Sequence, residues 1–395
     1  MQKLMILGAG IYQLPAIKTA KKLGYEVITV DNIPDNVGHK LSDFSENVST
    51  VDANGVLNVA KKHKIDGIMT IASDIAVLTV AYVGNKLHLP TITLEQAAIF
   101  SSKPRFKQFL FLKHFNVPVF KEVKCLKDAE ALFNELGGPL FIKPSDRSGS
   151  KGVARINSLN ELMQKFPTAL GASLIGSVCV ERFLEGVEVG CEAFCFGGKV
   201  AVIVITNKKM TDQFVVCGHS VPSDLSPDKI NQVEAMVEKV IKALDINWGP
   251  VNLDIMITKN GLYVIDIGAR LGGNGLPQIV GFSTGIDTVK MAIEVALGEK
   301  PSVPVRINDH PAGVRIFGTA RKAILISYAD FGSICSRFPE VIELVMDYHP
   351  GQKVNAFSEG KNRIGHVIVE CRPEQNADLI LDLIEQKLNF QYASY

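Results

Sequence analysis

Residues 252–270, NLDIMITKNGLYVIDIGAR, carry the most informative pattern in the chain: two apolar arms with one aspartate in each. β-Branched and aromatic residues favour strands, and Lys-Asn-Gly between the arms is typical of a tight turn. If the turn has two residues, Asp254 and Asp266 lie on opposite sides of the ribbon. If it has three residues, 259–261, the two aspartates lie directly opposite each other.

The three-residue turn is favoured because it separates the two faces of the hairpin. It gives one uninterrupted apolar face and places Asp254 and Asp266 together on the other. Carboxylates directly across a strand pair repel each other unless a cation neutralises them. Mg²⁺ commonly takes one or two carboxylates plus substrate phosphates. The hairpin therefore predicts a metal site, and the alternative is an exposed pair on a wet sheet face.

An arginine and a glycine-rich turn follow the hairpin, Arg270-Leu-Gly-Gly-Asn274. Beside a metal site, an arginine suits an anionic substrate or a transferring phosphoryl group. Arg270 is therefore a candidate catalytic residue.

A second segment, FIKPSDRSGSKG at 141–152, has the composition of a phosphate-covering loop. Lys143 ends a predicted strand and supplies a point charge that suits phosphate. Ser148, Gly149 and Ser150 lie in a flexible stretch whose backbone N–H groups can converge on one anion. The loop is not a Walker loop, because no glycine opens it and no Ser or Thr follows its second lysine. A solvated hairpin loop is the alternative.

The first hundred residues alternate short apolar strands with amphipathic helices, which predicts a parallel sheet covered by helices. Gly8-Ala-Gly10 follows the first strand and Asp31 ends the next, which is the skeleton of a dinucleotide-binding fingerprint. Gln13 stands where the third glycine would fall. We therefore expect a structural or substrate-lining turn here, and not a nicotinamide site.

Beyond residue 100 the alternation of short strands and helices ends. The pattern predicts a helix over 101–115 and strands with tight turns from 140 to 205. A long helix is expected over 227–244, and a small α+β tail beyond residue 311.

Composition excludes several classes of protein. The chain has 395 residues, enough for two or three domains, and its 42 basic and 41 acidic residues leave a net charge of +1. That balance argues against nucleic-acid binding through bulk phosphate attraction. No run of about 18 apolar residues exists, and the N-terminal apolar run is too short for a signal peptide. The 7 cysteines show no metal-ligand spacing, so we expect a reduced, cytoplasmic protein.

Together, the segments around Lys143 and the hairpin resemble the ATP-grasp superfamily, and more closely its carboxylate–amine ligases (the carbamoyl-phosphate-synthase-like and L-amino acid ligase-like branch). The resemblance implies a fold that combines α/β and α+β parts. These are a Rossmann-like front domain (residues 1–100), an ATP-grasp nucleotide clamp of two antiparallel-sheet subdomains (101–310, with a lid at about 116–186), and a small α+β C-terminal lobe (311–395).

The resemblance also assigns site residues. Lys103 and Lys143 contact phosphate, and the loop at 148–150 closes over it. Glu181 lies near the adenine amino group, backbone groups of Phe183 and Leu184 read the adenine edge, and Glu188 holds the ribose. Asp254 and Asp266 bind Mg²⁺, with Mn²⁺ as a substitute. Arg270 and Arg315 contact the substrate.

One departure from the family pattern concerns the metal. The usual second strand reads Glu-x-Asn-x-Arg, whereas this chain has Asp266-Ile-Gly268-Ala-Arg270. The glycine removes a side-chain ligand, so whether one or two metal ions bind stays open. Asn252 or Asn274 is a candidate substitute.

The implied activity is ATP-dependent ligation. The carboxylate becomes an acylphosphate with release of ADP, and an amine then displaces phosphate to form an amide or peptide bond. The expected partners are a small acid and an amine, and the resemblance allows a homodimer. The identity of both substrates and the pathway stay open. Specificity is expected from loops near 10–13 and 73–74, from residues 281–285 and from the C-terminal lobe.

Three alternatives remain. In the first, the protein activates bicarbonate or formate, as the carboxylase and carbamoyl-phosphate branches do. In the second, it binds ATP without ligase activity, an alternative that the missing ligand at Gly268 motivates. In the third, it is an oxidoreductase that binds its cofactor in the front domain, an alternative that Gln13 argues against.

Overall fold

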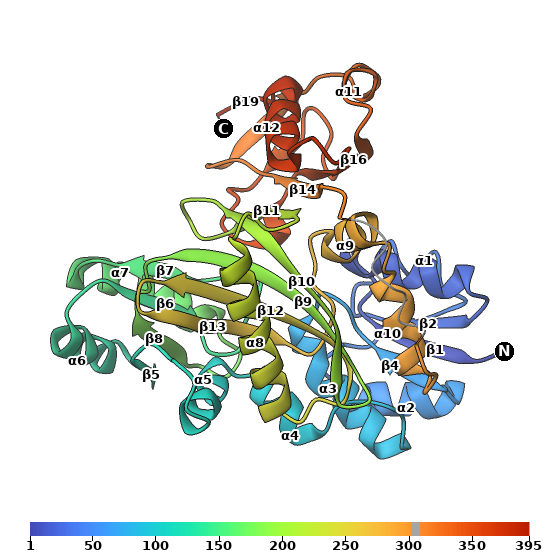
Figure 1. Ribbon diagram of the computed structural model, residues 1–395, viewed down its shortest axis with the longest axis horizontal. Helices are drawn as coiled ribbons and strands as arrows, with labels where there is room; N and C mark the ends of the chain where they lie inside the picture. Colours follow the sequence, from blue (N-terminus) through green and yellow to red (C-terminus); the bar gives the residue numbers. More distant parts are fainter. Residues whose placement is uncertain (302–308, 395) are drawn as a thin grey trace.

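Four sheets and their covering helices make up the part of the chain that the computed structural model describes, residues 1–301 and 309–394 (Figure 1). Residues 302–308 and 395, which fall in the predicted clamp and C-terminal lobe, lie outside the described residues. The mixture of one parallel sheet with antiparallel sheets confirms the predicted fold class. The limits of the individual domains stay predictions.

The front domain is a parallel sheet of order β3-β2-β1-β4, as the alternating pattern predicts. Its strands are β1 Lys3–Leu7, β2 Glu26–Val30, β3 Phe44–Glu46 and β4 Gly67–Met69. Its helices are η1 Ile11–Gln13, α1 Leu14–Lys22, α2 Ala53–His63 and α3 Asp74–Leu87. β1, β2 and β4 are almost wholly buried because helices cover both faces of the sheet.

The glycine turn after β1 uses its polar groups internally. Gln13 is buried: its side-chain oxygen accepts a hydrogen bond from the Gly10 N–H at 3.1 Å, and its amide donates to the Ile71 carbonyl at 2.7 Å. The Asp31 carboxylate accepts from the Ala9 N–H at 2.9 Å. This geometry favours the expected structural turn, because Asp31 and Gln13 already use their side chains to hydrogen-bond the protein's own backbone.

The lid is an antiparallel sheet of order β5-β8-β6-β7. Its elements are β5 Phe120–Val123, α6 Leu126–Leu136, β6 Leu140–Pro144, β7 Ala154–Ile156, α7 Leu159–Ala172 and β8 Val178–Arg182. The prediction of strands alone from 140 to 205 is wrong at α7, where Ser158 caps a helix that tolerates Pro167. The helix predicted over 101–115 is shorter, α5 Lys103–Leu112, because Ser102 caps its start after α4 Leu94–Phe100.

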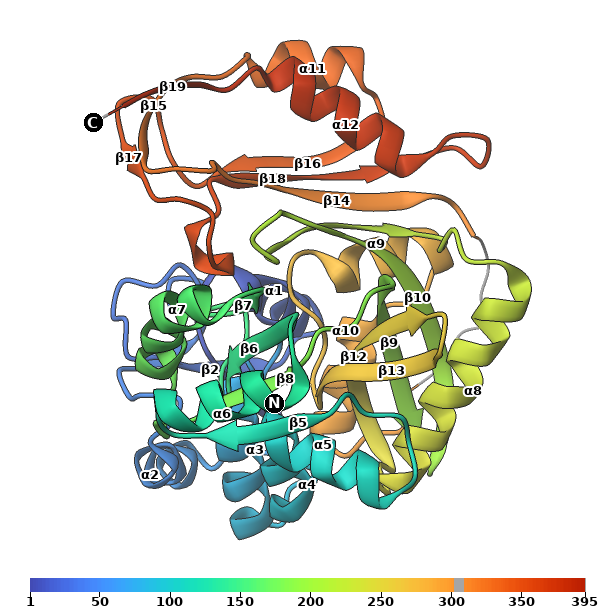
Figure 2. The same ribbon diagram turned by 90° about the vertical axis from the view of Figure 1, so that its left-hand side faces the viewer.

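An eight-stranded antiparallel sheet of order β13-β12-β9-β10-β11-β14-β18-β16 runs from the clamp into the C-terminal lobe. Its strands are β9 Val187–Phe196, β10 Lys199–Met210, β11 Val216–Val221, β12 Trp248–Thr258, β13 Gly261–Gly268, β14 Ala312–Phe317, β16 Val341–Met346 and β18 Gly365–Glu370. The remaining elements are α8 Pro227–Ala243, α9 Leu276–Thr284, α10 Thr288–Ala296, β15 Ala323–Ser327, α11 Phe331–Arg337, β17 Lys353–Val354, η2 Gly360–Asn362, α12 Ala377–Leu388 and β19 Gln391–Ala393. Figure 2 shows α12 lying over β14 and β18.

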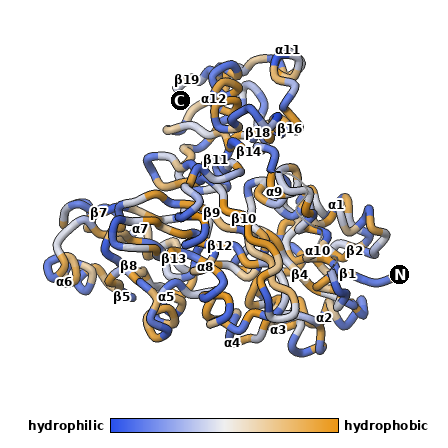
Figure 3. Tube along the Cα trace, viewed as in Figure 1, coloured by the Kyte–Doolittle hydropathy of each residue, from blue (hydrophilic) through white to orange (hydrophobic). Residues whose placement is uncertain are grey.

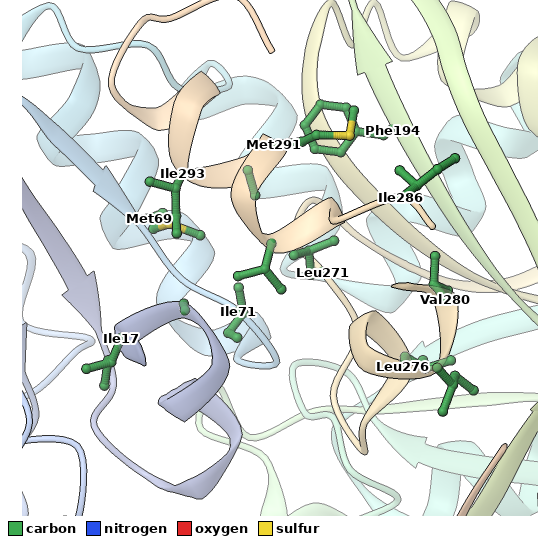
Figure 4. Close-up of a cluster of buried hydrophobic side chains, with 14 of the residues drawn as sticks. Ile17, Met69, Ile71, Phe194, Leu271, Leu276, Val280, Ile286, Met291 and Ile293 are labelled. Carbon is green, nitrogen blue, oxygen red and sulfur yellow. The ribbon is translucent and has the colours of Figure 1, made fainter. Parts of the chain in front are cut away.

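One hydrophobic core joins the front domain to the clamp. Ile17 and Met69 of the front domain pack in the same cluster as Leu271, Met291 and Ile293 (Figure 4). Hydrophilic stretches gather in the outer loops, and hydrophobic stretches run through the central strands (Figure 3). The shared core holds α1 of the front domain against α10, beside the segment that follows β13.

Two further findings bear on the expectations from composition. No helix of the described residues has the length and hydropathy needed to cross a bilayer. All the cysteines are free thiols.

Candidate active site

A cavity of about 430 Å³, the first cavity, lies where the front domain, the lid and the eight-stranded sheet meet. The predicted site residues that line it are Lys103, Lys143, Ser148, Gly149, Ser150, Glu188, Asp254, Asp266 and Arg270. Those that do not line it are Glu181, Phe183, Leu184 and Arg315. The fold thus gathers residues that are far apart in sequence around one space.

The two aspartates lie opposite each other in the hairpin, as predicted, but a β-bulge produces this register and not the predicted turn. Asp254 pairs with Asp266, as expected, whereas Thr258 pairs with Gly261. The turn therefore has two residues, and the predicted three-residue turn is wrong. A β-bulge next to Asp254 inserts Ile265 into the second strand, and this extra residue brings the aspartates back into register.

A lysine neutralises each aspartate. Lys103 pairs with Asp266, and the Lys208 ammonium lies 2.7 Å from the Asp254 carboxylate and 2.5 Å from that of Glu188. Burial raises the pKa of Asp266, but Lys103 and Lys143 lower it by more, so it stays below its ordinary value. The repulsion expected between the aspartates is thus removed by ammonium groups.

Lys208 was missed by the sequence interpretation. Its side chain is only 4% exposed, and burial lowers its pKa less than Asp254 and Glu188 raise it, so it stays charged. A signal was available: Lys208 and Lys209 are adjacent in one strand, so one of them must point to the inner face.

The two aspartates fit a magnesium ion that takes its other ligands from phosphate and water. Both are oxygen ligands on one face of the hairpin, and both line the first cavity. Within residues 1–301 and 309–394, no group of three or more His, Cys, Asp or Glu side chains is arranged for a metal ion. A metal ion bound by these two carboxylates would take its remaining ligands from phosphate or water.

Lys143 belongs to a buried ion-pair network. Its ammonium lies 2.6 Å from one carboxylate oxygen of Glu181, and the ammonium of Lys107 lies 2.6 Å from the other. Burial lowers the pKa of Lys143, but Glu181 and Asp266 raise it by more, so the lysine stays charged. Lys107, one turn after Lys103 on α5, was missed because its apolar neighbours indicate only a core face.

The adenine roles predicted for Glu181 and Phe183 are not favoured by these contacts. Glu181 is 5% exposed, and both of its oxygens face lysines. It is placed to hold Lys143 in position and has no oxygen free for a base. The backbone N–H of Phe183 already donates to the Pro139 carbonyl at 3.0 Å. For Leu184, no contact indicates a role.

Arg270 is held from two sides. It donates to the Asp74 carboxylate of the front domain at 2.8 Å and to the Asn252 side-chain oxygen at 3.0 Å. Asn252 in turn donates to Glu192 at 2.5 Å. Both ends of Asn252 are therefore engaged, which does not favour it as the substitute metal ligand.

Gly268 has a steric reason to be glycine. A Cβ atom at this position would lie 2.6 Å from an oxygen of Asp74 and 3.1 Å from the Arg270 guanidinium carbon. Any side chain would displace one of the two. The departure from the family pattern at this position therefore coincides with a carboxylate supplied by the front domain.

Glu192 on β9 holds Asn252 and the glycine turn after β13 in place. Its carboxylate accepts from Asn252 and from the Gly272 N–H at 3.1 Å. Burial raises the pKa of Glu192 to about 7, and these hydrogen bonds and Arg270 counteract only part of the shift. The sequence offered no signal for it, since a glutamate within an apolar strand has no local partner.

The predicted phosphate loop is anchored to two other segments that line the cavity. The Ser150 hydroxyl donates to the Phe214 carbonyl at 2.7 Å, and the Gly149 carbonyl accepts from the Gly360 N–H at 3.0 Å. Buried His219 also lines the cavity; burial lowers its pKa to about 3, so it is neutral near pH 7.

The predicted substrate role of Arg315 is not supported by its position. Arg315 is 1% exposed on β14, and its guanidinium donates to Asp382 and Glu385 of α12 at 2.7 Å each. It points away from the first cavity and ties the C-terminal helix to the sheet.

Comparison with known proteins supports the sequence interpretation. Residues 100–274 match the model of the ATP-grasp domain. The carbamoyl phosphate synthase large chain of Thermoanaerobacter pseudethanolicus is 25% identical over 321 residues, which cover 76% of this chain and 29% of that protein. The chain thus spans less than a third of the length of that relative.

Two solved structures share the fold over nearly the whole chain. The L-amino acid ligase from Bacillus licheniformis has a TM-score of 0.84 at 20% identity, covering 100% of this chain and 99% of that chain. The phosphoribosylglycinamide synthetase from Anaerococcus prevotii has a TM-score of 0.77 at 24% identity, covering 99% and 100%. The predicted resemblance is thereby confirmed: the chain contains an ATP-grasp domain and has the fold of the ATP-grasp ligases.

Proposed function

We propose that this protein is an ATP-dependent ligase that converts a small carboxylic acid into an acylphosphate and joins it to an amine, with release of ADP and phosphate. The observation that carries the proposal is the pairing of Asp254 with Asp266 beside Arg270, in one cavity that also receives Lys103 and Lys143. This set of groups suits phosphoryl transfer, in which positioning and charge neutralisation supply most of the catalysis.

The roles of the chain's own residues follow from their positions. Lys103, Lys143 and Lys208 present buried ammonium groups to the cavity and are suited to hold phosphate oxygens. Arg270, fixed by Asp74 and Asn252, is suited to hold the carboxylate of the acid. The loop at 148–150 covers the cavity and excludes water, which would otherwise hydrolyse the acylphosphate.

Asp254 and Asp266 would hold Mg²⁺, or Mn²⁺ in its place, and the ion would neutralise phosphate charge. Whether one or two ions bind, and whether the protein is a homodimer, stay predictions.

The proposal is tested by measuring ADP release from ATP and Mg²⁺ across a panel of acids and amines. Asp266→Asn should abolish ADP formation while the protein stays folded; a modest fall in thermal midpoint is expected, because Lys103 loses its partner. Asp228→Asn, an exposed change on α8, is the matched control. Unchanged turnover in Asp266→Asn would remove the metal-site assignment. ADP formation with bicarbonate alone would replace the ligase by a bicarbonate-activating enzyme.

A further inference from the structure

The C-terminal lobe reaches the first cavity through one short segment, residues 356–363, which contains η2. Residues 359–361 of this segment line the cavity, and so do residues 148–151 of the phosphate loop. The roles given above use the loop but not the segment from the lobe. A contact between the two would therefore connect the C-terminal lobe to the cover of the cavity.

One backbone hydrogen bond makes this connection. The Gly360 N–H donates to the Gly149 carbonyl at 3.0 Å. The peptide bond between Gly149 and Ser150 is trans, so its C=O and its N–H point in opposite directions. Because Gly360 holds the carbonyl, it also fixes the direction of the Ser150 N–H. That N–H is one of the backbone groups suited to hold a phosphate oxygen.

The phosphate loop needs such a contact because its backbone is strained. Gly149, Ser150 and Gly152 have positive φ angles of 67°, 59° and 70°. This conformation is unfavourable for a residue with a side chain, as Ser150 is, and it persists only where the surroundings enforce it. The loop is therefore held by partners outside itself, which are Gly360 and the Phe214 carbonyl.

The segment from the lobe offers a rigid base. Phe357 is buried, and its N–H donates to the Thr319 carbonyl at 2.8 Å. The Asn362 side chain donates to the Ala356 carbonyl at 3.1 Å and so closes the segment on itself. The position of η2 is thus set by the C-terminal lobe before the loop meets it.

The front domain holds the other side of the same residue. The Tyr12 hydroxyl of η1 donates to the Gly360 carbonyl at 3.3 Å. The Tyr12 ring is held in turn by Arg363, whose guanidinium carbon lies 5.3 Å from the ring centre. Gly360 therefore bonds the lid through its N–H and the front domain through its carbonyl.

We propose that Gly360 is a positioning residue for the ligation: its N–H holds the phosphate loop over the first cavity and keeps water from the acylphosphate. The inference rests on the proposed ligase function. Where the loop is released, a water oxygen bonds to the acyl carbon, and the bond from that carbon to the phosphate oxygen breaks with its electron pair leaving on phosphate. The acid is regenerated, one proton of the water leaves with phosphate as HPO₄²⁻, and the other goes to solvent. ATP is then hydrolysed without product.

Position 360 allows a matched pair of substitutions in the full-length protein. The backbone of Gly360 is not left-handed, and a Cβ there would lie 3.8 Å from the Gly149 carbonyl oxygen, so Gly360→Ala keeps the contact. Gly360→Pro removes the N–H and places a ring carbon against that oxygen. Proline suits the first residue of a helix, and Glu359 before it is extended, with φ −156° and ψ 156°. The two variants thus differ at the contact and not in the fold of the segment.

Trypsin reports on the loop without any substrate. Lys151 lies in the loop and is partly exposed, so the bond after it is cut when the loop leaves the contact. We expect Gly360→Pro to raise the initial rate of this cut roughly fivefold or more, with Gly360→Ala within about twofold of the unaltered protein. Mass spectrometry identifies the fragment that ends at Lys151. Cleavage after exposed Lys259, in the turn between β12 and β13, is the internal control and should be equal in all proteins.

A trapping assay measures the exclusion of water. Hydroxylamine converts an acylphosphate into a hydroxamate, so the ratio of ADP to hydroxamate reports how much acylphosphate reacts with water instead. The assay uses ATP, Mg²⁺, hydroxylamine and the acid of the panel that gives the most ADP. We expect the ratio to rise roughly threefold or more in Gly360→Pro and to stay unchanged in Gly360→Ala.

A second variant keeps the test decisive if Gly360→Pro does not fold. Tyr12→Phe removes the hydroxyl that donates to the Gly360 carbonyl. It should shift the cleavage rate and the ratio in the same direction, by roughly twofold. Tyr82→Phe, which removes an exposed hydroxyl that donates to Asn54 at 2.9 Å, is its control and should shift neither.

The outcomes are distinct. Equal cleavage after Lys151 in Gly360→Pro and Gly360→Ala would show that η2 does not hold the loop and would overturn the inference. Faster cleavage with an unchanged ratio would also overturn it, because the held loop would then not keep water out. If the unaltered protein forms no hydroxamate with any acid, the proposed function fails and the exclusion of water fails with it. The cleavage rates need no substrate, so they separate that result from a failure of the contact itself.

Discussion

Gly268 shows how a single missing side chain shapes the site. The space beside its Cα is filled by a carboxylate oxygen of Asp74 and by the guanidinium of Arg270, and these two groups form an ion pair at 2.8 Å. The family pattern has an asparagine at this position of the strand. In this chain the glycine leaves room for Asp74 of the front domain. The position of Arg270 therefore depends on a contact between domains.

Gly268→Asn should displace Asp74 from Arg270. Since misplacing a positioning group by about 1 Å can cost on the order of 100-fold in rate, we expect ADP formation to fall by roughly ten- to a hundredfold. Gly171→Ala on α7 is the control, because a Cβ there meets nothing within 4 Å. Full turnover in Gly268→Asn would mean that the Asp74 contact has no part in catalysis.

Lys208 is a second residue whose effect can be isolated. Because its ammonium occupies the Asp254 carboxylate, it competes with a metal ion for the same oxygen atoms. Lys208→Met should strengthen Mn²⁺ binding to the nucleotide-free protein by roughly tenfold, or about 1.4 kcal/mol. Electron paramagnetic resonance of free Mn²⁺ measures this affinity, with Lys209→Met on the opposite face as control. Equal affinity in both variants would argue against the competition.

At the scale of elements, the site is built by strand order. β9 lies between β10 and β12, so Glu192 of β9 is directly opposite Asn252 of β12 and reaches the turn that follows β13. Lys208 on β10 reaches across β9 to Asp254 on β12. The middle strand therefore supports the β12–β13 hairpin, and burial raises the pKa of its Glu192 to about 7.

The raised pKa of Glu192 predicts a pH dependence of stability. The ordinary pKa is 4.5 and the folded value is about 7. Below the lower value the group is protonated in both states. Between the two values the folded protein keeps a proton that the unfolded chain releases, so rising pH destabilises the fold, by about 3 kcal/mol in full above pH 7.

In Glu192→Gln the side chain does not titrate, so this variant does not lose that stability as the pH rises. Its thermal midpoint, measured without nucleotide, should therefore gain on that of the unaltered protein between pH 5 and pH 8. Glu238→Gln, an exposed change on α8, should show no such gain. A difference in midpoint that is the same at both pH values would refute the assignment.

At the scale of the whole molecule, one sheet runs from the β12–β13 hairpin into the C-terminal lobe, and the lobe lines one side of the cavity of about 690 Å³ between that lobe and the front domain. Arg315 on β14 secures this arrangement by pairing with Asp382 and Glu385 of α12. Its buried charge is thus used to dock a helix, at a distance from both cavities.

Arg315→Leu separates docking from catalysis. The thermal midpoint should fall by roughly 2–4 °C per kcal/mol of lost docking energy, while the rate of hydroxamate formation per folded molecule stays within twofold. Arg337→Leu, an exposed change on α11, is the control. A tenfold or greater loss of rate in fully folded Arg315→Leu would restore the substrate role predicted from the sequence.

Local patterns sufficed for much of this protein. Periodicity predicted the alternating front domain and the apolar arms of the hairpin, because each depends on residues within a few positions of one another. The charge rule for facing carboxylates predicted that Asp254 and Asp266 need a cation. The register came out as predicted at the aspartates, although the bulge at Ile265 that produces it had no local signal.

Only the tertiary structure revealed the groups that complete the site. Asp74 meets Arg270 across 196 residues of sequence, and Lys208 meets Asp254 only because β9 lies between their strands. Glu181 and Arg315 match a motif in sequence, yet in space Glu181 pairs with two buried lysines and Arg315 pairs with two acids of α12. Periodicity indicates which face of an element is apolar. Sheet order and domain packing determine which charged groups from distant segments come into contact. Such groups are buried as pairs because burying one of them alone would cost more free energy than burying both together.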